Sequence, residues 1–533
     1  MYKMKKYTVI MCTVCCLIAS AVQAKKLTII YVPLDNRPVC ASYVQQTMAA
    51  AGCNIIMPPE KYIAGHDNSG DADAICNWLQ HKAPKADAAV ISSDSLIYGG
   101  LVASRTHQIP VETLNKRLKN IHDLETSLPI KLYVFSTIMR TPYTSSGNVE
   151  PEYYSKLGPA IFTYSQLLDK VEQTKLSLLE RLKKQALERN LPRWELKDWL
   201  DRRKKNLNVN HELANMARGN RFHYLAIGKD DNAALSATHM EARAISRNTF
   251  DIPDKKFQIL PGVDQLGLLL LARAYNEANG ATPSIYALYS KGVGPSTLPQ
   301  YSDTRLQDSV PEQIIAAGAK KATNLSSADL ILALNTPENG IMQDTTAGSN
   351  QFFASAANKD FILSLKKQLS AGYKVSLADV SYSNGADNGF MNALAQSGQI
   401  ERLIAYNGWN TADNTIGFAI AQGILSAAMS PQQSNKLMRQ RIIDDWYYQS
   451  NARNRMVEFF RQKGRENLRY NLGKANEEVL KQVTNDCQTL ADKYPITHGT
   501  IFKLSFPWDR LFEIDVEIEN RYKRIPRCQS VLY

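Results

Sequence analysis

Long hydrophobic runs are scarce in this chain of 533 residues, and none lies beyond its N-terminal segment. The mean hydropathy is −0.31, which excludes a protein that crosses a membrane several times. Glycine (27) and proline (22) are too few for a collagen-like or broadly disordered chain. With 44% hydrophobic and 21% charged residues, the composition is that of an ordinary globular protein.

Familiar cofactor and nucleophile motifs are also missing from the sequence. It has no GxGxxG fingerprint after a strand, no GxxxxGK[ST] phosphate loop, no HExxH and no GxSxG. Its eight histidines form no pair with ligand spacing, so a histidine-based zinc site is not expected. No organic cofactor is expected either, whereas a divalent cation held by aspartate oxygens stays open.

Cysteine is rare beyond the first 24 residues. The five cysteines there are odd in number and contain no CxxC pair, so they predict neither a disulfide framework nor a zinc knot. One bridge, between Cys487 and Cys528, remains open in an oxidising compartment. The other three cysteines, expected as buried free thiols, are Cys40, Cys53 and Cys76.

The first 24 residues have the pattern of a cleaved secretory signal. Lysines at the start precede an apolar stretch from Tyr7 to Val22, and the segment ends in the small-x-small triplet Val22-Gln23-Ala24. The stretch is shorter than the ~20 residues that a membrane span requires. We therefore expect an exported protein, periplasmic or secreted, with no stable membrane span once the signal is removed.

The charge excess is mild. The formal net charge is +12, and three of the positive charges (Lys3, Lys5 and Lys6) belong to the predicted signal. Such a balance does not indicate nucleic acid as a partner. A small molecule or an oligosaccharide is the expected partner.

From residue 25 to about residue 430, short apolar runs alternate with helical patterns, which is typical of parallel sheets with crossover helices. We predict two consecutive α/β lobes, residues 25–282 and 283–430, after the signal at 1–24. A single elaborated β/α barrel is the alternative. The predicted strands are Leu27–Val32, Asn54–Met57, Ala88–Ser92, Lys131–Ser136, His223–Ile227, Phe257–Leu260, Ser284–Tyr289, Leu330–Leu334, Lys374–Ala378 and Leu403–Tyr406.

Two segments depart from this alternation. Residues 164–217 are long, charged and helical, and they predict a helical insertion in the first lobe, either a solvated hairpin or a lid. Residues 431–533 predict an appendage, with a helical part up to Tyr494 and a β tail over Thr500–Ile518.

Most predicted strands run into a loop that carries Asp, Asn or Arg beside Gly or Pro. Each such loop alone is explained by turns and helix caps, but parallel strands gather their carboxyl ends at one edge, where α/β proteins bind ligands. The arginines would grip a carboxylate or hydroxyl pair, and Trp409 would stack on a sugar or pack in the core. The candidate substrate-binding residues are Asp35, Arg37, Asp94, Arg105, Arg140, Asp264, Asp379, Asn384, Asn407, Trp409 and Asn410.

Asp230 and Asp231 are the candidate catalytic pair. Two consecutive carboxylates that leave an apolar strand crowd like charges, which raises one pKa and separates acid and base roles. A similar pair occurs in substrate-assisted N-acetylhexosaminidases, where one carboxylate orients the acetamido group and the other protonates the leaving oxygen. In that scheme Asp230 orients and Asp231 protonates, or the reverse. Caps on the helix that follows are the alternative explanation.

Seven longer motifs stand out along the chain: YVPLDNRPV, SSDSLIYGGLVASR, GKDDN, PGVDQ, ADVSYSNGADN, NGWNTADNTIG and FPWDRLFE. Together they resemble a bacterial family catalogued as a domain of unknown function, number 4127. The resemblance runs from about Leu27 to Glu513, and the sequence departs from the family pattern at Gln265, where an acidic residue is expected. The family lends no settled activity, while the frequent carbohydrate-utilisation setting of its members implies a carbohydrate substrate.

These observations lead to one functional expectation and two alternatives. An exported glycosidase with aspartate acid/base chemistry, with or without substrate assistance on N-acetylhexosaminides, fits the acidic and amide-rich loops best. One alternative is a metal-dependent amide or ester hydrolase whose ion is held by Asp35, Asp94, Asp230 and Asp264. The other is a non-catalytic periplasmic carbohydrate-binding protein with two lobes.

Overall fold

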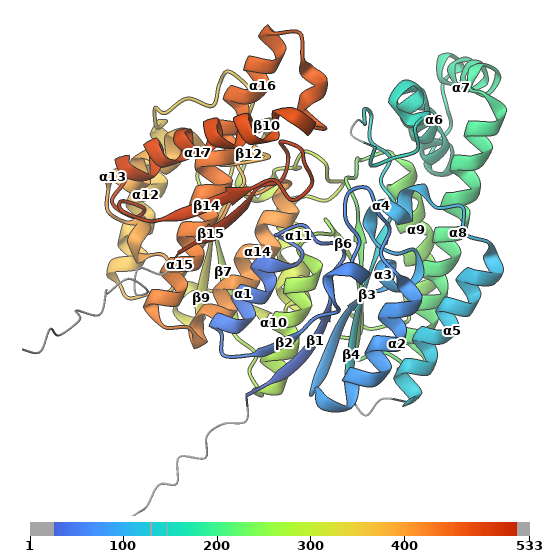
Figure 1. Ribbon diagram of the computed structural model, residues 1–533, viewed down its shortest axis with the longest axis horizontal. Coiled ribbons are helices and arrows are strands. Elements are labelled where there is room, and N and C mark those ends of the chain that lie inside the picture. Colours follow the sequence, from blue (N-terminus) through green and yellow to red (C-terminus); the bar gives the residue numbers. More distant parts are fainter. Residues whose placement is uncertain (1–25, 128–129, 146–147, 520–533) are drawn as a thin grey trace, which may run out of the picture.

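The computed structural model describes residues 26–127, 130–145 and 148–519. The predicted signal and Cys528, and with it the open Cys487–Cys528 pairing, lie outside these ranges. The four described cysteines are free and buried. The described chain is an α/β protein with two parallel sheets, as predicted (Figure 1).

The first lobe contains a six-stranded parallel sheet in the order β2-β1-β3-β4-β5-β6. Its strands are rich in β-branched and aromatic residues, and β3 to β5 are buried almost throughout because helices cover both faces. The order reverses between β1 and β3, the topological switch point of doubly wound folds. The strands are β1 Thr28–Val32, β2 Asn54–Ile56, β3 Ala88–Ser92, β4 Lys131–Ile138, β5 Tyr224–Lys229 and β6 Phe257–Pro261.

The second lobe repeats this arrangement with a five-stranded parallel sheet in the order β13-β11-β9-β7-β8. Both sheets are open and end in edge strands, so the barrel alternative is wrong. A two-stranded parallel pair of β10 Gln343–Asp344 and β12 Tyr382–Ser383 lies beside it. The strands are β7 Ser284–Tyr289, β8 Lys320–Lys321, β9 Leu330–Asn335, β11 Val375–Asp379 and β13 Ala405–Asn407.

Two helices join the lobes through a shared core. α10 packs against β3 and β4 of the first sheet, α14 packs against β9, β11 and β13 of the second, and the two helices contact each other. One hydrophobic cluster accordingly runs from Ile29 through Leu269 to Leu332 and Ile416. The helices of the two lobes are α1 Ser42–Ala50, α2 Ala72–Lys82, α3 Ser93–Ile97, α4 Leu101–Thr106, α5 Val111–Ser127, α9 Ala237–Thr249, α10 Leu266–Ala278, α11 Leu306–Ala316, α12 Ala356–Ser370, α13 Asn388–Gln396 and α14 Ala412–Leu425.

Three helices fill the insertion between β4 and β5. α7 (Leu178–Asn190) buries no residue, whereas α8 (Arg193–Arg218) packs against α5, α9, β4 and β5. The insertion begins with α6 (Tyr154–Gln173), about ten residues before the predicted start, because its first two turns already pack, with Tyr154 and Ile161 buried. In the insertion, α8 therefore forms a supporting layer of the first lobe, whereas α7 is exposed.

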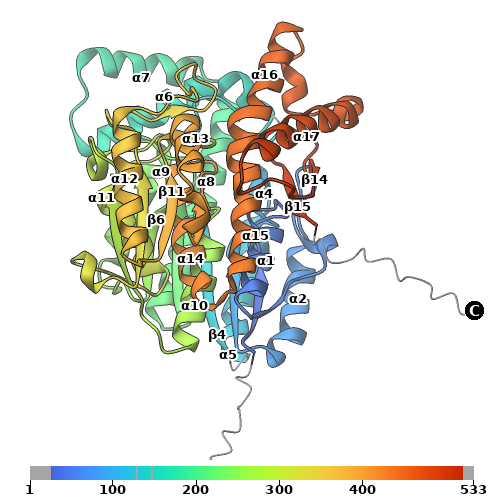
Figure 2. The same ribbon diagram turned by 90° about the vertical axis from the view of Figure 1, so that its left-hand side faces the viewer.

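The C-terminal segment packs on the second lobe and returns to the first. Its aromatic residues, such as Trp446, share a core with β9 and β11. The two strands form an antiparallel hairpin, as the alternating tail predicts. Figure 2 shows this segment along one side of the molecule. Its elements are α15 Pro431–Arg441, the π-helix η7 Ile442–Ala452, α16 Arg453–Gln462, α17 Asn476–Lys493, β14 Phe502–Ser505 and β15 Asp515–Ile518.

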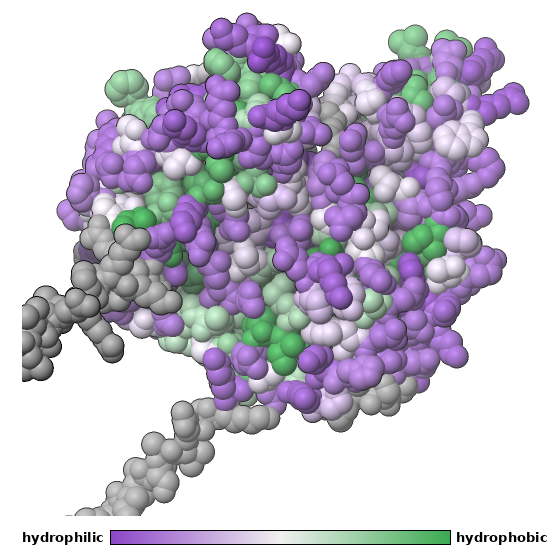
Figure 3. Space-filling view, in the orientation of Figure 1, coloured by the Kyte–Doolittle hydropathy of each residue, from purple (hydrophilic) through white to green (hydrophobic). Residues whose placement is uncertain are grey.

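The face seen in Figure 1 carries mostly hydrophilic side chains with apolar ones interspersed (Figure 3). Among the helices of the described ranges, none is long and apolar enough to cross a membrane.

Candidate functional site

A cavity of about 510 Å³ opens at the carboxyl ends of the first sheet. Its walls come from the loops after β1, β4, β5 and β6, from the second lobe, and from the C-terminal segment. This volume lies within the range of small-molecule sites. The predicted residues that line it are Arg37, Arg105, Arg140, Asp230, Asp231, Asp264, Asn384 and Asn410.

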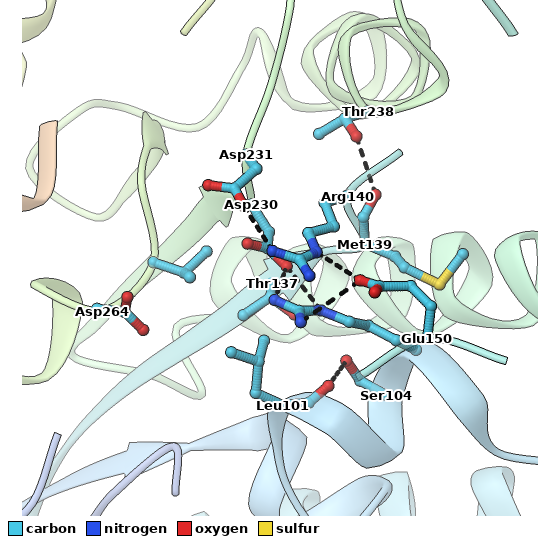
Figure 4. A network of polar contacts seen from close by, with 12 residues as sticks. Leu101, Ser104, Thr137, Met139, Arg140, Glu150, Asp230, Asp231, Thr238 and Asp264 are labelled. Carbon is cyan, nitrogen blue, oxygen red and sulfur yellow. Dashed lines mark hydrogen bonds and ion pairs between the residues drawn. The ribbon is translucent and has the colours of Figure 1, made fainter. Parts of the chain in front are cut away.

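Asp230 and Asp231, directly after β5, are each held by a different arginine. Arg105 donates from Nε and Nη2 to one oxygen of Asp230, at 3.0 and 2.6 Å. Arg140 donates from Nη1 to Asp231 at 2.6 Å and from Nε to Glu150 at 2.6 Å. Glu150 also lies 3.7 Å from Arg105, so one carboxylate bridges both arginines (Figure 4).

The two aspartates therefore differ in environment. Asp230 exposes 5% of its side chain, whereas Asp231 exposes 25%. Burial raises the pKa of Asp231, the Arg140 cation lowers it, and the neighbouring Asp230 raises it again, with a net increase above the ordinary value. Asp231 is thus the more accessible of the pair, and its raised pKa suits a proton donor.

A second network forms where the loops after β1 and β6 meet the second lobe. Arg37 donates to Asp35 at 2.9 Å and to Asp264 at 2.6 Å, so it bridges two carboxylates. Asp264 also accepts hydrogen bonds from the side chains of Asn410 (3.2 Å) and Asn414 (3.4 Å). Burial raises the pKa of Asp264 and Arg37 offsets part of that rise. Asp35 itself lies behind the cavity wall and positions Arg37.

Asp94, at the start of α3, is buried beneath the cavity and does not line it. One carboxylate oxygen accepts a hydrogen bond from Thr137 at 2.7 Å, and the other has no partner. Burial raises the pKa of Asp94 to about 7, with a smaller contribution from the Asp230 charge. Asp94 is therefore a mostly uncharged neighbour of the aspartate pair below about pH 7.

Strained backbone gathers at the cavity. Four of its residues other than glycine have positive φ: Asp231 (25°), Tyr301 (64°), Asn384 (61°) and Asn410 (64°). Such conformations cost of order 1 kcal/mol or more and concentrate at functional sites. The loops of Asn384 and Asn410 hold each other, because the Asn384 amide donates to the Asn410 carbonyl at 2.8 Å.

Three predicted residues lie away from this cavity. Asp379 pairs with Asn335 (2.9 Å) near a second cavity of about 530 Å³ at the carboxyl ends of the second sheet, and burial raises its pKa to about 8. Asn407 bonds Gln422 in the interior. Trp409 is buried against the rings of Phe418 and Phe512, so it is a core residue and offers no surface for stacking.

The insertion holds the site from behind. Arg203 of α8 donates to the carbonyls of Met139 (2.8 Å) and Arg140 (3.1 Å) and pairs with Glu241. One turn later, Asn206 donates to the carbonyl of Ser104 at 2.8 Å. This polar row on α8 fixes the backbone at Arg140 and directly before each of the two site arginines.

Several residues of the site were not found from the sequence. Glu150, which pairs with both site arginines behind the cavity wall, precedes α6 with no motif around it, and Tyr301, which lines the cavity, follows no predicted strand. The FPWDRLFE stretch could have indicated this wall, because its Trp508 and Arg510 line the cavity. The centroid of the Trp508 ring lies 5.3 Å from the guanidinium carbon of Arg37 and 4.8 Å from that of Arg510. The aromatic wall thus comes from the C-terminal segment.

The four carboxylates considered as metal ligands do not form a common ligand set. Arg37 bridges Asp35 and Asp264, Arg105 holds Asp230, and Asp94 lies beneath them with Thr137. Across residues 26–127, 130–145 and 148–519, no cluster of three or more His, Cys, Asp or Glu side chains is arranged to hold a metal ion.

The sequence model of one family matches residues 29–517, so the chain belongs to the family described as "Protein of unknown function (DUF4127)". No curated protein matches the chain, and no solved structure does. Gln265, the position that departs from the expected family pattern, is fully buried at the start of α10 and donates to the Pro261 carbonyl at 2.8 Å.

Proposed function

We propose that the protein is an exported carbohydrate-active hydrolase, a glycosidase that uses Asp231 as general acid and Asp230 as its ionised partner. One observation carries the proposal: two consecutive carboxylates face the same cavity with different partners. Arg105 donates two hydrogen bonds to Asp230, while burial and the Asp230 charge raise the pKa of Asp231 and favour its protonated form. Glycoside hydrolysis requires this division between two carboxylates.

On an N-acetylhexosaminide, the acetamido oxygen of the substrate attacks the anomeric carbon while the bond to the leaving group breaks. Asp231 gives its proton to the leaving oxygen, and Asp230 accepts a hydrogen bond from the acetamido N–H and stabilises its developing positive charge. Water then opens the cyclic intermediate, and its proton returns to Asp231. Arg105, Arg140 and Glu150 keep both carboxylates in place.

Polar cavity walls suit a hydroxyl-rich ligand. Asn384, Asn410 and Thr346 offer neutral donors and acceptors, and Tyr301 exposes 41% of its surface as an aromatic face. The shared core of the lobes favours a cavity of fixed shape over the hinge closure of a two-lobed binding protein.

The test is a panel of aryl glycosides that includes N-acetylhexosaminides, with the wild type, Asp230→Asn, Asp231→Asn and the surface control Asp254→Asn, each with and without EDTA. We expect Asp231→Asn to lose roughly 10²–10⁴-fold in kcat/KM, more with a poor leaving group than with an activated one. Asp254→Asn should match the wild type. Loss with EDTA would favour the metal hydrolase, and tight binding without turnover would favour the non-catalytic protein; either result overturns the proposal.

A further inference from the structure

Arg453, the first residue of α16, lines the cavity and has no ion-pair partner among the described residues. Its surface is 94% buried, and its Nε atom is buried without a hydrogen-bond acceptor. Its guanidinium carbon lies 5.4 Å from the centroid of the Phe512 ring. A buried cation without an anion is costly unless something pairs with it.

The chain fixes this cation in place. Arg453 follows directly on η7, an eleven-residue π-helix whose residues are all buried. Segments of π-helix are rare and occur frequently at functional sites. The backbone that carries Arg453 is therefore held in place by a fully buried segment.

Arg469 repeats the arrangement on the same wall. It lines the cavity, lies 4.6 Å from the centroid of the Tyr470 ring, and has a buried Nε without an acceptor. Arg510, beside them, is paired with Glu513. The C-terminal wall thus carries two guanidinium groups that form no ion pair within 4.0 Å with a carboxylate of the described chain.

The first-lobe wall is different. Its three arginines are all paired, and carboxylates outnumber them: Arg37 pairs with Asp35 and Asp264, and the other two pair with Asp230, Asp231 and Glu150. The unpaired positive charge therefore lies on the wall formed by the C-terminal segment, at Arg453 and Arg469.

Asp344 is the carboxylate that Arg453 influences most clearly. Burial raises the pKa of Asp344, but the Arg453 charge and hydrogen bonds from Asn384 and Thr346 bring it below the ordinary value. Asn384 donates to Asp344 at 2.6 Å and Thr346 donates to its other oxygen at 2.7 Å. Asp344 thus uses both carboxylate oxygens for hydrogen bonds to Asn384 and Thr346. Its single negative charge is also too little to neutralise the two positive charges of Arg453 and Arg469.

From this geometry we propose that the cavity binds an acidic sugar, with an anionic substituent seated at Arg453 and Arg469. A uronate carboxylate fits the planar fork of a guanidinium, and a sulfate ester offers the same charge. This inference deepens the proposed glycosidase function. It rests on that function only in assuming that the bound sugar is hydrolysed; binding of the anion does not depend on hydrolysis. The subsite would make the enzyme select glycans that carry a negative charge near the bond to be cleaved.

The test measures binding by calorimetry, so it does not depend on turnover. The probes are a tetrasaccharide of alternating N-acetylhexosamine and uronic acid, its carboxyl-reduced counterpart, and a neutral tetrasaccharide bearing one sulfate. We expect the uronate glycan to bind wild type roughly tenfold to a hundredfold more tightly than the reduced one. Arg453→Gln and Arg469→Gln should each remove most of this preference, and Arg453→Lys should restore part of it.

Arg455→Gln is the matched control, because Arg455 lies on the same helix, exposes 54% of its side chain and pairs with Asp486. Thermal unfolding shows whether each variant is folded. If Arg453→Gln does not fold, Arg469→Gln tests the subsite instead, because Arg469 is only partly buried. Preference for the sulfated glycan that depends on Arg453 assigns the anion as sulfate and supports the subsite. Equal binding of all three glycans, or a preference that Arg455→Gln removes equally, overturns it. Binding with the expected preference but no hydrolysis would refute the proposed function and leave the subsite standing.

Discussion

Arg37 lies over the indole ring of Trp508, with its guanidinium carbon 5.3 Å from the ring centroid. Arg37 belongs to the loop after β1, and Trp508 belongs to the connection between β14 and β15. Their contact therefore attaches the C-terminal hairpin to the first lobe. The Trp508 Nε1 also donates to the Asn36 side chain at 2.6 Å. The cavity wall formed by the C-terminal segment depends on this attachment.

Trp508→Ala should therefore destabilise the protein. Removing a buried tryptophan costs about 3–5 kcal/mol, and Trp508→Phe, which keeps a ring over Arg37 but loses the bond to Asn36, should cost about 1–2 kcal/mol. Urea denaturation measures both values. The control is Trp194→Ala, because Trp194 is 67% exposed and its loss should stay within about 0.5 kcal/mol. Equal losses at both tryptophans would contradict the attachment.

Arg140→Gln should move the pH dependence of catalysis. Arg140 lowers the pKa of Asp231, so removing its charge raises that pKa further. A general acid works only while protonated, and the alkaline limb of kcat/KM should therefore shift to higher pH by roughly one unit. Kinetics on an activated aryl glycoside between pH 4 and 9 measure the shift.

Arg181→Gln, at an exposed position on α7, is the control for that profile and should leave it unchanged. If instead the acidic limb of Arg140→Gln moves to higher pH while the alkaline limb stays in place, Asp231 acts as the ionised group of the pair, and the roles of the two aspartates are exchanged.

Much of the fold could be predicted because buried parallel strands leave a clear pattern. Ala88–Ser92 and Ser284–Tyr289 coincide with β3 and β7 residue for residue, since each is an apolar run bounded by turn-forming residues. The two-residue strands β8 and β10 were not found. They consist of polar residues at the surface, and pairing alone, without burial, leaves no periodic signal.

The site was accessible from the sequence only on its first-lobe side. Loops after parallel strands share an edge, which places Arg37, Asp230 and Asp264 together. The same rule misplaces Asp379, because the second sheet has its own carboxyl edge and its own cavity. Arg453 and Trp508 follow no parallel strand, and their position depends on how the C-terminal segment packs, which spacing along the chain does not encode.

Arg203 should prove to be a positioning residue whose removal lowers the free energy of unfolding strongly. Arg203→Met leaves Glu241 buried without its partner, and breaking such a pair costs about 3–5 kcal/mol. The double variant Arg203→Met/Glu241→Met should recover most of that loss, because it removes both charges. Urea denaturation measures the cycle, and a double variant as unstable as the single one would show that the bonds to the Met139 and Arg140 carbonyls carry the effect instead.

Asp94→Asn should change how stability depends on pH. In the folded protein burial raises the pKa of Asp94 to about 7, whereas in the unfolded chain it titrates near its ordinary value, so the folded state holds one more proton between roughly pH 4 and 7. This carboxyl therefore lowers the free energy of unfolding as pH rises through that window, and the loss is constant above it.

The asparagine variant has no titrating proton, and its amide can occupy the place of the carboxylate oxygen that lacks a partner among the described residues. The difference in unfolding free energy, variant minus wild type, should grow by about 1 kcal/mol per pH unit from pH 4 to 7 and then level off. Asp254→Asn, at the surface, should show no such slope, and a flat difference for Asp94→Asn would mean that Asp94 is already ionised in the folded protein at low pH.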